Sequence, residues 1–399
     1  MQAPAPQPLP PERRAWLWLV ESSGHRPAAQ RALLRRFGGP EQVQALPEAQ
    51  RHAFVGAPAR PAEAPEAWAR RLAAVEAWQA GAPQRHLLAL GDADYPEALL
   101  SLPDPPLWLY AEGLLDRLAA PALAVVGSRN PTPAGADHAR AFARDLAARG
   151  LLIVSGLARG IDAAAHEGAL AAAGGAGTLA VIGTGIDRLY PASHAALARR
   201  IVADGLLLSE YPLGTPPLAA NFPRRNRLIA GLGQGTLVIE AALASGSLIT
   251  ARLAAEAGRE VLAIPGSIDS PQSRGCHSLI KQGAQLVETV DDVLDALGGV
   301  LAGRLADAAP RVVAVEGPVA EPGEATGASG AEPTAQPTAE GDETDPLLRA
   351  LGHDPVDLDT LVARTGLDAA SLNVQLLALE LDGRLARLGG GRVQRRGRA

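Results

Sequence analysis

The sequence predicts an α/β protein with an extended Rossmann-like core built on a parallel sheet, an N-terminal helical domain and a C-terminal winged helix. Three observations support this fold class. Short runs that are apolar on both faces recur between residues 122 and 264 and alternate with helix-like sequence, which is typical of a parallel sheet covered on both sides. The first 84 residues show helical periodicity, and residues 345–399 show two helices followed by a glycine-rich wing.

The composition is that of an ordinary globular protein, with 399 residues of which 47% are hydrophobic and 20% are charged. This length indicates two to four domains. No apolar run approaches the roughly 18 residues that span a membrane, and the N-terminus lacks an apolar signal core, so we expect a cytoplasmic protein without membrane contact. The single cysteine, Cys276, excludes an internal disulfide and a cysteine-based zinc site, and we expect no metal and no cofactor.

Residues 1–84 are expected to form the helical domain. One helix is indicated by apolar side chains at helical spacing, namely Trp68, Leu72, Val75 and Trp78. An earlier helix is expected to end at the glycine pair 38–39. We interpret the aromatic residues of this domain as core residues instead of a ligand site.

Residues 85–299 are assigned to the core domain. A proline-rich connector at 86–115 contains one apolar run, 107–110, that we expect to be an edge strand. The strands of the sheet are expected at the apolar runs 122–126, 151–155, 178–182, 206–208, 236–239 and 261–264. After the first of these runs, Thr132 and Pro133 predict a helix start, with threonine as the N-cap and proline in the first turn.

Residues 300–344 predict a disordered linker, because this stretch of alanine, proline, glycine and glutamate has too few large apolar side chains to offset the entropy of ordering. Residues 300–345 contain nine acidic residues and two arginines. Their net charge is 2 − 9 = −7, which is larger in magnitude than the net charge of −6 of the whole chain. The remaining sequence is therefore near neutral, and it can bind phosphates where its arginines cluster.

Residues 345–399 predict the winged helix, with its recognition helix between Asp368 and Asp382. That helix contains Glu380 and no lysine or arginine, whereas helices that read DNA sequence present basic or amide side chains to the bases. The wing and tail are basic, with Arg384, Arg387, Arg392, Arg395, Arg396 and Arg398. We therefore predict a role in protein contact or weak duplex binding instead of sequence reading.

Three loops that follow predicted strands combine glycine with arginine. Gly127, Ser128 and Arg129 follow the first strand, Arg159 follows the second and Arg188 the third. Parallel sheets bind ligands at the carboxyl ends of their strands, where backbone N–H groups and arginines contact anions. The dinucleotide fingerprint G-x-G-x-x-G is absent, so we expect a bound phosphate and not NAD. The alternative is a plain strand-to-helix turn with a surface arginine.

The segment 221–232 concentrates cations around one aromatic ring. It contains Phe222, Arg224, Arg225, Asn226 and Arg227. The arginines can contact phosphates, and the ring can stack on a base, which contributes about 1–3 kcal/mol per base in any sequence. The alternative is that Phe222 fills the core beneath a proline turn and that the arginines are solvated, since the three cannot all point the same way. Ser247, in the hydroxyl-rich run 245–250, adds a further donor.

Two other functions are compatible with single motifs. The glycine-rich run 231–236, followed by Glu240, loosely resembles the phosphate-binding loop of nucleoside-monophosphate phosphoribohydrolases, although the paired-glycine form is missing. A nucleotide-hydrolysing enzyme of this kind is therefore the alternative function, and a winged-helix regulator with a ligand-binding core is a third. Asp162 and His166 are spaced to hydrogen-bond to each other, and we expect a structural role for them instead of acid–base catalysis.

Seven motifs stand in the order found in the DNA-processing protein A (DprA/Smf) family, which the chain resembles over roughly residues 85–295. The motifs are Gly127-Ser128-Arg129, 155–162, Gly183-Thr184-Gly185, Ser209-Glu210-Tyr211, 222–232, 245–250 and 264–267. The N-terminal helices are similar to the sterile-alpha-motif-like (SAM-like) domain of that family, and the C-terminal module is similar to its winged helix.

The resemblance implies a non-catalytic homodimer that binds and protects single-stranded DNA, loads the recombinase RecA onto it and helps to displace single-strand-binding protein in natural transformation. It also implies that Ser128 and Arg129 contact phosphates and that residues 222–227 line the DNA groove. Many relatives have a lysine after the tyrosine-proline pair, where this chain has Ala192, and Arg188 is the candidate substitute. The apolar stretch 279–297 is expected to form part of the dimer face, or else the last strand and helix of the core.

Overall fold

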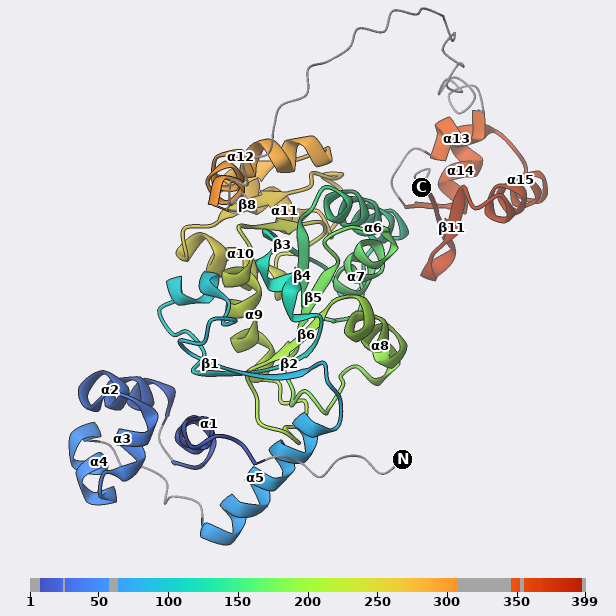
Figure 1. The fold of residues 1–399 in the computed structure, drawn as a ribbon. Helices are drawn as coiled ribbons and strands as arrows, with labels where there is room; N and C mark the ends of the chain where they lie inside the picture. The colour runs from blue at the N-terminus through green and yellow to red at the C-terminus, as the bar shows by residue number, and fades with distance from the viewer. Residues whose placement is uncertain (1–7, 24–25, 57–63, 308–345, 352–354, 397–399) are drawn as a thin grey trace, which may run out of the picture. The chain divides into compact units, whose positions relative to one another are not determined.

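The computed structural model describes residues 8–23, 26–56, 64–307, 346–351 and 355–396 (Figure 1). The chain divides into two compact units, the first ending at Gly298 and the second beginning at Gly299. The first unit holds the N-terminal helices and the predicted core domain, and the second holds the winged helix. Among the described residues, none of the helices combines the length and the apolar character that a membrane span requires.

A nine-stranded sheet lies at the centre of the first unit, in the order β1-β2-β6-β5-β4-β3-β7-β8-β9. Its strands are β1 (Arg85–Ala89), β2 (Trp108–Gly113), β3 (Ala122–Val126), β4 (Leu152–Ser155), β5 (Thr178–Val181), β6 (Leu206–Ser209), β7 (Gly235–Val238), β8 (Glu260–Ala263) and β9 (Gln285–Leu286). The strands from β3 to β9 pair in parallel. The predicted parallel core is confirmed, and β3 to β7 are buried at every position, which explains their fully apolar sequences.

The expected edge strand at 107–110 is wrong in its position. Strand β2 lies inside the sheet and pairs antiparallel with both β1 and β6, so that β1 is the edge. Strand β1 was not predicted from the sequence, because only its second half, from Leu87 to Ala89, is apolar and buried, whereas Arg85 and His86 are partly exposed.

Helices cover both faces of the sheet. One face carries α6 (Pro133–Ala148), α7 (Ile161–Ala171) and α8 (Ala195–Asp204), and the other carries α9 (Asn221–Leu232), α10 (Ser247–Glu256) and α11 (Arg274–Lys281) (Figure 1). The predicted start of α6 is confirmed, since the Thr132 hydroxyl accepts a hydrogen bond from the Gly135 N–H at 3.0 Å.

The strand order reverses between β3 and β7. From β3 the chain winds outward through β4, β5 and β6, and it then returns to place β7 on the other side of β3. At such a switch point the loops leave the two neighbouring strands in opposite directions and open a crevice at their carboxyl ends. The fold therefore assigns the ligand site to the loops after β3 and β7.

The N-terminal helices are α1 (Pro11–Leu17), α2 (Pro27–Phe37), α3 (Pro40–Ala45), α4 (Glu48–Val55) and α5 (Pro65–Ala80), with a π-helical turn after α1. They pack on the sheet through a buried cluster that includes Leu33 of α2, Trp78 of α5 and Tyr110 of β2. The Tyr110 hydroxyl also donates to the carboxylate of Glu21. These helices are therefore anchored to the sheet by apolar burial and a buried hydrogen bond.

Helix α12 (Val290–Asp307) continues to Asp307, so residues 300–307 extend a helix where the composition predicted the beginning of the linker. The rest of the predicted linker, 308–344, lies outside the described residues. The stretch 279–297, the candidate dimer face, comprises the end of α11, β9 and the start of α12.

The second unit confirms the predicted winged helix. Its elements are α13 (Pro346–Leu351), β10 (Val356–Asp357), α14 (Leu358–Thr365), α15 (Ala369–Leu381), β11 (Leu385–Arg387) and β12 (Arg392–Arg395). The strands pair in the order β10-β12-β11, with the glycines 389–391 between the last two in sequence. Asp357 and Asp368 cap α14 and α15 by accepting hydrogen bonds from backbone N–H groups of their first turns.

Candidate nucleic-acid interface

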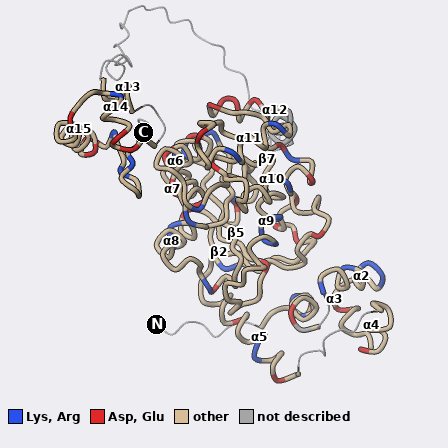
Figure 2. The backbone as a smooth tube through the Cα atoms, turned by 180° about the vertical axis from the view of Figure 1, so that it is seen from behind, with Lys and Arg blue, Asp and Glu red and all other residues tan. Residues whose placement is uncertain are grey.

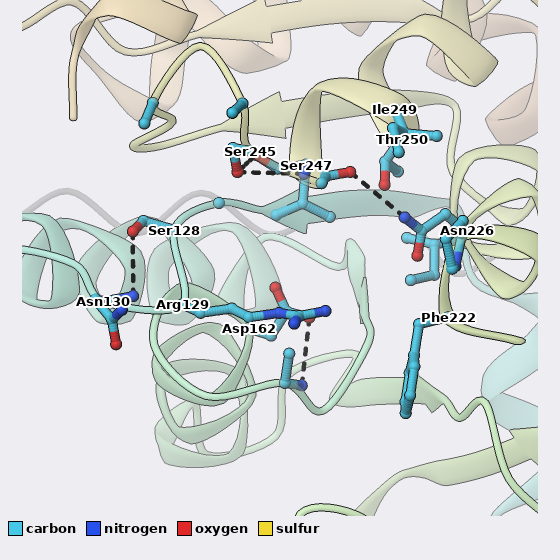
Figure 3. Close-up of a pocket in the computed structure, with 18 of the residues that line it drawn as sticks. Ser128, Arg129, Asn130, Asp162, Phe222, Asn226, Ser245, Ser247, Ile249 and Thr250 are labelled. Carbon is cyan, nitrogen blue, oxygen red and sulfur yellow. Dashed lines mark hydrogen bonds between the residues drawn. The ribbon is translucent and has the colours of Figure 1, made fainter. Parts of the chain in front are cut away.

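A pocket of about 460 Å³ lies at the carboxyl ends of the parallel strands, where the loops after β3 and β7 meet the first turns of α9 and α10 (Figure 3). This volume falls in the range of about 300–1,000 Å³ that is usual for ligand pockets. Seven of the eleven predicted DNA-binding residues line it, namely Gly127, Ser128, Arg129, Phe222, Arg225, Asn226 and Ser247. The fold thus brings together three segments that are distant in the sequence.

The loop after β3 places one exposed guanidinium at the pocket. A Cβ at position 127 would lie 2.9 Å from the backbone oxygen of Glu240, so the close approach of the two loops requires Gly127. The Asn130 N–H donates to the Ser128 hydroxyl at 3.1 Å and fixes the turn. The exposed Arg129 side chain extends into the pocket (Figure 3), and no carboxylate in the described part of the chain forms an ion pair with it.

Helix α10 begins at the pocket with Ser247, and Ser245 precedes it in the adjoining loop. The hydroxyls of Ser245 and Ser247 lie 2.7 Å apart, and the Ser245 hydroxyl accepts from the Ser247 N–H at 3.3 Å. The Asn226 amide donates to the Gly246 carbonyl at 3.5 Å and links α9 to this turn. Because the N-terminus of a helix carries a partial positive charge, this end of α10 favours an anion in the pocket.

Arg225 contributes to the pocket lining, but its guanidinium is buried. Nη1 donates to the carbonyl of Val181 at the end of β5. The same atom passes so close to Gly156 that a Cβ there would lie 2.1 Å away. Burial lowers the pKa of Arg225 to about 10, and the negative charge of Asp162 opposes this shift. Arg225 therefore joins α9 to β5 and to the loop after β4.

Asp162 and His166 hold the loop 156–158 instead of bonding to each other. The Asp162 carboxylate accepts from two backbone N–H groups of this loop, at 3.1 and 3.4 Å. Nε2 of His166 accepts from the N–H of Leu157 at 3.3 Å, and Nδ1 lies 2.7 Å from the Thr178 hydroxyl. Burial lowers the pKa of His166 to about 3, so the ring is neutral. These bonds are consistent with the expected structural role.

Phe222 forms an aromatic pair with Tyr190 at the edge of the pocket. The ring centroids are 5.5 Å apart and the rings are tilted by 43°. Tyr190 is 48% exposed, and Phe222 is half-buried against Gly183, where a Cβ would lie 3.0 Å from its ring. Phe222 is thus not a core plug, and the pair offers two partly exposed rings to a planar ligand.

Four predicted residues do not line the pocket. Arg159 and Arg224 are exposed outside the lining, and Arg188 is exposed beside Asp187, with 3.8 Å between its Nε and the carboxylate. The expectation that Arg188 contributes to the DNA groove is therefore not supported by the lining of this pocket.

Arg227, the fourth of these residues, is buried on the other side of α9. Its guanidinium pairs with Glu210 at 2.5 Å and with Asp104 at 3.1 Å. The three arginines of α9 thus point in different directions, as the sequence indicated, because consecutive helical residues project about 100° apart.

Three polar or aromatic groups near the pocket were missed by the sequence analysis. Asn130 belongs to the same loop as Gly127, Ser128 and Arg129, but it was not named as a site residue. Gln272 lines the pocket and donates to the Asn130 carbonyl at 3.3 Å, and Tyr190 pairs with Phe222. Neither carries a local signal, because only the tertiary fold brings these two residues to the site.

Glu240, the residue on which the hydrolase hypothesis depends, is not part of the pocket lining. Its carboxylate accepts from the N–H and the hydroxyl of Thr132, at 2.9 and 2.5 Å, at the start of α6. Burial raises its pKa, and the bonds from Thr132 oppose this. Glu240 thus joins the end of β7 to the start of α6.

The predicted recognition helix α15 exposes apolar side chains. Val374, Leu377 and Leu381 follow the i, i+3, i+7 spacing of one helix face, and Val374 and Leu381 are 70% and 80% exposed. The opposite face is buried in the core of the second unit. A face of this kind lacks the donors and acceptors that read base edges, which favours protein contact over sequence reading.

Comparison with known proteins adds independent information on these residues. The family model described as DNA recombination-mediator protein A matches residues 86–298, and the model described as DprA winged helix domain matches residues 331–391. Protein Smf of Escherichia coli (strain K12) is 43% identical over 315 residues, which are 79% of this chain and 78% of the relative. DNA processing protein DprA of Streptococcus pneumoniae is 50% identical over 203 residues, which are 51% of this chain and 71% of the relative. The X-ray structure of DprA from Streptococcus pneumoniae matches with a TM-score of 0.59 at 38% identity, covering 71% of this chain and 97% of that chain.

We expect Arg225→Met to lower the free energy of unfolding by about 3–5 kcal/mol, because the change leaves the buried Asp162 carboxylate without its counter-charge. Arg224→Met removes the same charge from an exposed neighbouring position and should change it by about 0.5 kcal/mol or less. Urea unfolding followed by circular dichroism measures both variants. Equal effects would contradict the structural role of Arg225.

We expect His166 to make stability depend on pH. Its folded pKa of about 3 lies below the unfolded value of about 6.5, so the unfolded state binds the proton first, and stability is lost as the pH falls below about 6.5. From pH 7 to pH 5 the loss due to this residue is about 2 kcal/mol. The contribution of His166 is the unfolding free energy of the wild type minus that of His166→Gln, measured at each pH. If this difference does not change with pH, the prediction is wrong.

Proposed function

The chain belongs to the DNA recombination-mediator protein A family, and we propose that it binds single-stranded DNA, without cleaving it, in the pocket at the carboxyl ends of the strands. The observation that carries this proposal is the presence, in and beside one pocket, of the exposed Arg129 guanidinium, the start of α10 and the Phe222–Tyr190 pair. The guanidinium and the helix N-terminus suit phosphates, and the rings suit bases. Cationic pockets with stacking aromatic residues hold single strands in many proteins.

Single strands suit this pocket better than duplexes. A base must expose a face to stack on Phe222, whereas in a duplex both faces are covered by neighbouring bases. Extracting a base from a duplex costs a few kcal/mol, and the described pocket offers few groups to compensate for that cost. We therefore propose that strand state, and not base sequence, is what this site recognises.

We propose further that the protein acts as a mediator, which passes the bound strand to the RecA recombinase and helps to displace single-strand-binding protein. Membership of a recombination-mediator family supports this step and, with it, a role in protecting DNA that enters by natural transformation. A homodimer is part of the proposal. It is supported by β9, which forms an edge of the sheet within the stretch 279–297 and exposes the apolar side chain of Leu286 (45%), because a sheet edge with an exposed apolar side chain can pair with a second chain.

The nucleotide-hydrolase alternative has no observation in its favour. Its key carboxylate, Glu240, is engaged by the N–H and hydroxyl of Thr132 at the start of α6. A general acid or base must instead reach the substrate within hydrogen-bonding distance. Release of free base from nucleoside monophosphates, lost in Glu240→Gln, would revive this alternative.

We expect Arg129→Ala to weaken binding of a single-stranded oligonucleotide by about tenfold, because one charge-assisted contact to a phosphate is lost. The slope of log K against log salt concentration should also decrease by about 0.7. Fluorescence anisotropy of a labelled oligonucleotide across a salt series measures both quantities.

Arg200→Ala is the matched control for this experiment, since Arg200 is an exposed arginine on α8 that does not line the pocket. It removes the same charge and should leave affinity and slope nearly unchanged. If both variants weaken binding equally, or if the wild type binds duplex as tightly as single strand, the proposed site is wrong.

A further inference from the structure

Helix α2 of the N-terminal helices brings a second group of arginines to the first turn of α9. Arg31 of α2 is close enough to Arg224 and Arg227 of α9 to interact electrostatically, as it also does with Arg35 and Asp104. Its partial burial lowers the pKa of Arg31, Asp104 raises it, and the three guanidinium groups lower it further. Figure 2 shows basic positions on both α2 and α9. Two segments far apart in sequence thus form one cationic surface.

Two carboxylates, Glu210 and Asp104, neutralise part of this positive charge. Arg227 is buried and pairs with both Glu210 and Asp104. Within the described ranges, by contrast, no ion pair to a carboxylate engages the other three arginines, Arg31, Arg35 and Arg224. Arg35 and Arg224 are exposed, and Arg31 is half-buried. Three guanidinium groups are therefore available to an external anion.

Packing fixes the helices that carry these groups. Leu33 of α2 is fully buried in the cluster that continues through Trp78 to Tyr110 of β2. Leu228 and Ile229 of α9 are likewise buried in the core on the other face of the sheet. Side chains on fixed helices lose less entropy on binding than side chains on mobile loops, so the surface is preorganised for a ligand.

Along α9 the surface adjoins the pocket. Pro223 and Arg225, on either side of Arg224 in the sequence, both line the pocket, whereas Arg224 is outside the lining. A chain of phosphates that passes over the first turn of α9 therefore moves from the pocket to Arg224 and then to α2. Guanidinium groups suit such a chain because they bind phosphate oxygens in a bidentate manner.

We propose that Arg31, Arg35 and Arg224 bind the phosphates of a single strand where it leaves the pocket, and that they extend the DNA site from the core onto the N-terminal helices. This inference rests on the proposed function, since the pocket must hold the strand first. It assigns to the N-terminal helices a direct part in DNA binding, and it makes affinity depend on strand length.

The test compares a short and a long oligothymidylate, of about 5 and about 20 nucleotides, chosen because single-strand sites cover about 4–16 nucleotides. In the full-length protein we expect Arg31→Gln/Arg35→Gln to leave affinity for the short strand unchanged. Affinity for the long strand should fall about 10- to 30-fold at 0.1 M salt, and its salt slope should fall by about 1.4, since two phosphate contacts are lost.

Arg199→Gln/Arg200→Gln is the matched control, because it removes two exposed arginines from α8, outside the pocket and outside this surface. It should bind both strands as the wild type does. Arg224→Gln, a single change on the core side of the surface, should reduce the long-strand slope by about 0.7 and gives a second, independent variant.

The outcomes separate this inference from the proposed function. If the wild type binds both strands and the α2 variant binds the long strand as the wild type does, DNA binding by Arg31 and Arg35 is refuted, whereas the proposed binding in the pocket is not. A loss on both strands by the α2 variant would also refute it, since the change would then act on the pocket or the fold. If the wild type binds neither strand, the proposed function is wrong, and so is the proposed extension of the DNA site onto the N-terminal helices.

Discussion

The buried guanidinium of Arg225 is the interaction on which the site depends. It crosses Gly156, bonds to the Val181 carbonyl and balances the charge of Asp162, which in turn binds the N–H groups of the loop 156–158. A charge without a partner inside a protein costs several kcal/mol, so this set of partners must form together. It fixes α9 against the carboxyl ends of the strands, and the pocket is the space that remains between α9, the β3 loop and α10.

As a result, the arginines near the site have different roles. Because Arg225 is buried in the interior and Arg227 pairs with two carboxylates, Arg224 is the arginine of α9 that remains for a ligand, in addition to Arg129 in the pocket. The site also has two aromatic rings, because Phe222 pairs with Tyr190. The site therefore has separate positions for phosphates and for bases, which is the arrangement expected for recognition of a flexible single strand.

Much of the architecture could be predicted from the sequence, because the strands of a doubly covered parallel sheet are apolar on both faces and therefore easy to locate. The order of the strands and the place of β2 could not, since pairing is a tertiary property and β1 is only half apolar. Of the seven predicted residues in the pocket, Gly127, Ser128 and Arg129 follow from the rule that ligands bind at the carboxyl ends of parallel strands, and the other four follow from the composition of the segments 221–232 and 245–250. The sequence indicated that the three arginines of α9 differ in direction, but it could not show that Arg225 and Arg227 are the buried ones, because this depends on the carboxylates and carbonyls that the fold places beside them. Tyr190 and Gln272 were missed because only the fold brings them to the site.

The most direct test of the central claim is photocrosslinking of the full-length protein to a bromodeoxyuridine-substituted single strand, followed by mass spectrometry of the crosslinked peptides. A base that stacks in the proposed site should crosslink to Phe222 or Tyr190. The bromodeoxyuridine duplex of the same sequence should give little product. Crosslinks confined to the winged helix, with none at either ring, would contradict the claim that this pocket holds single-stranded DNA.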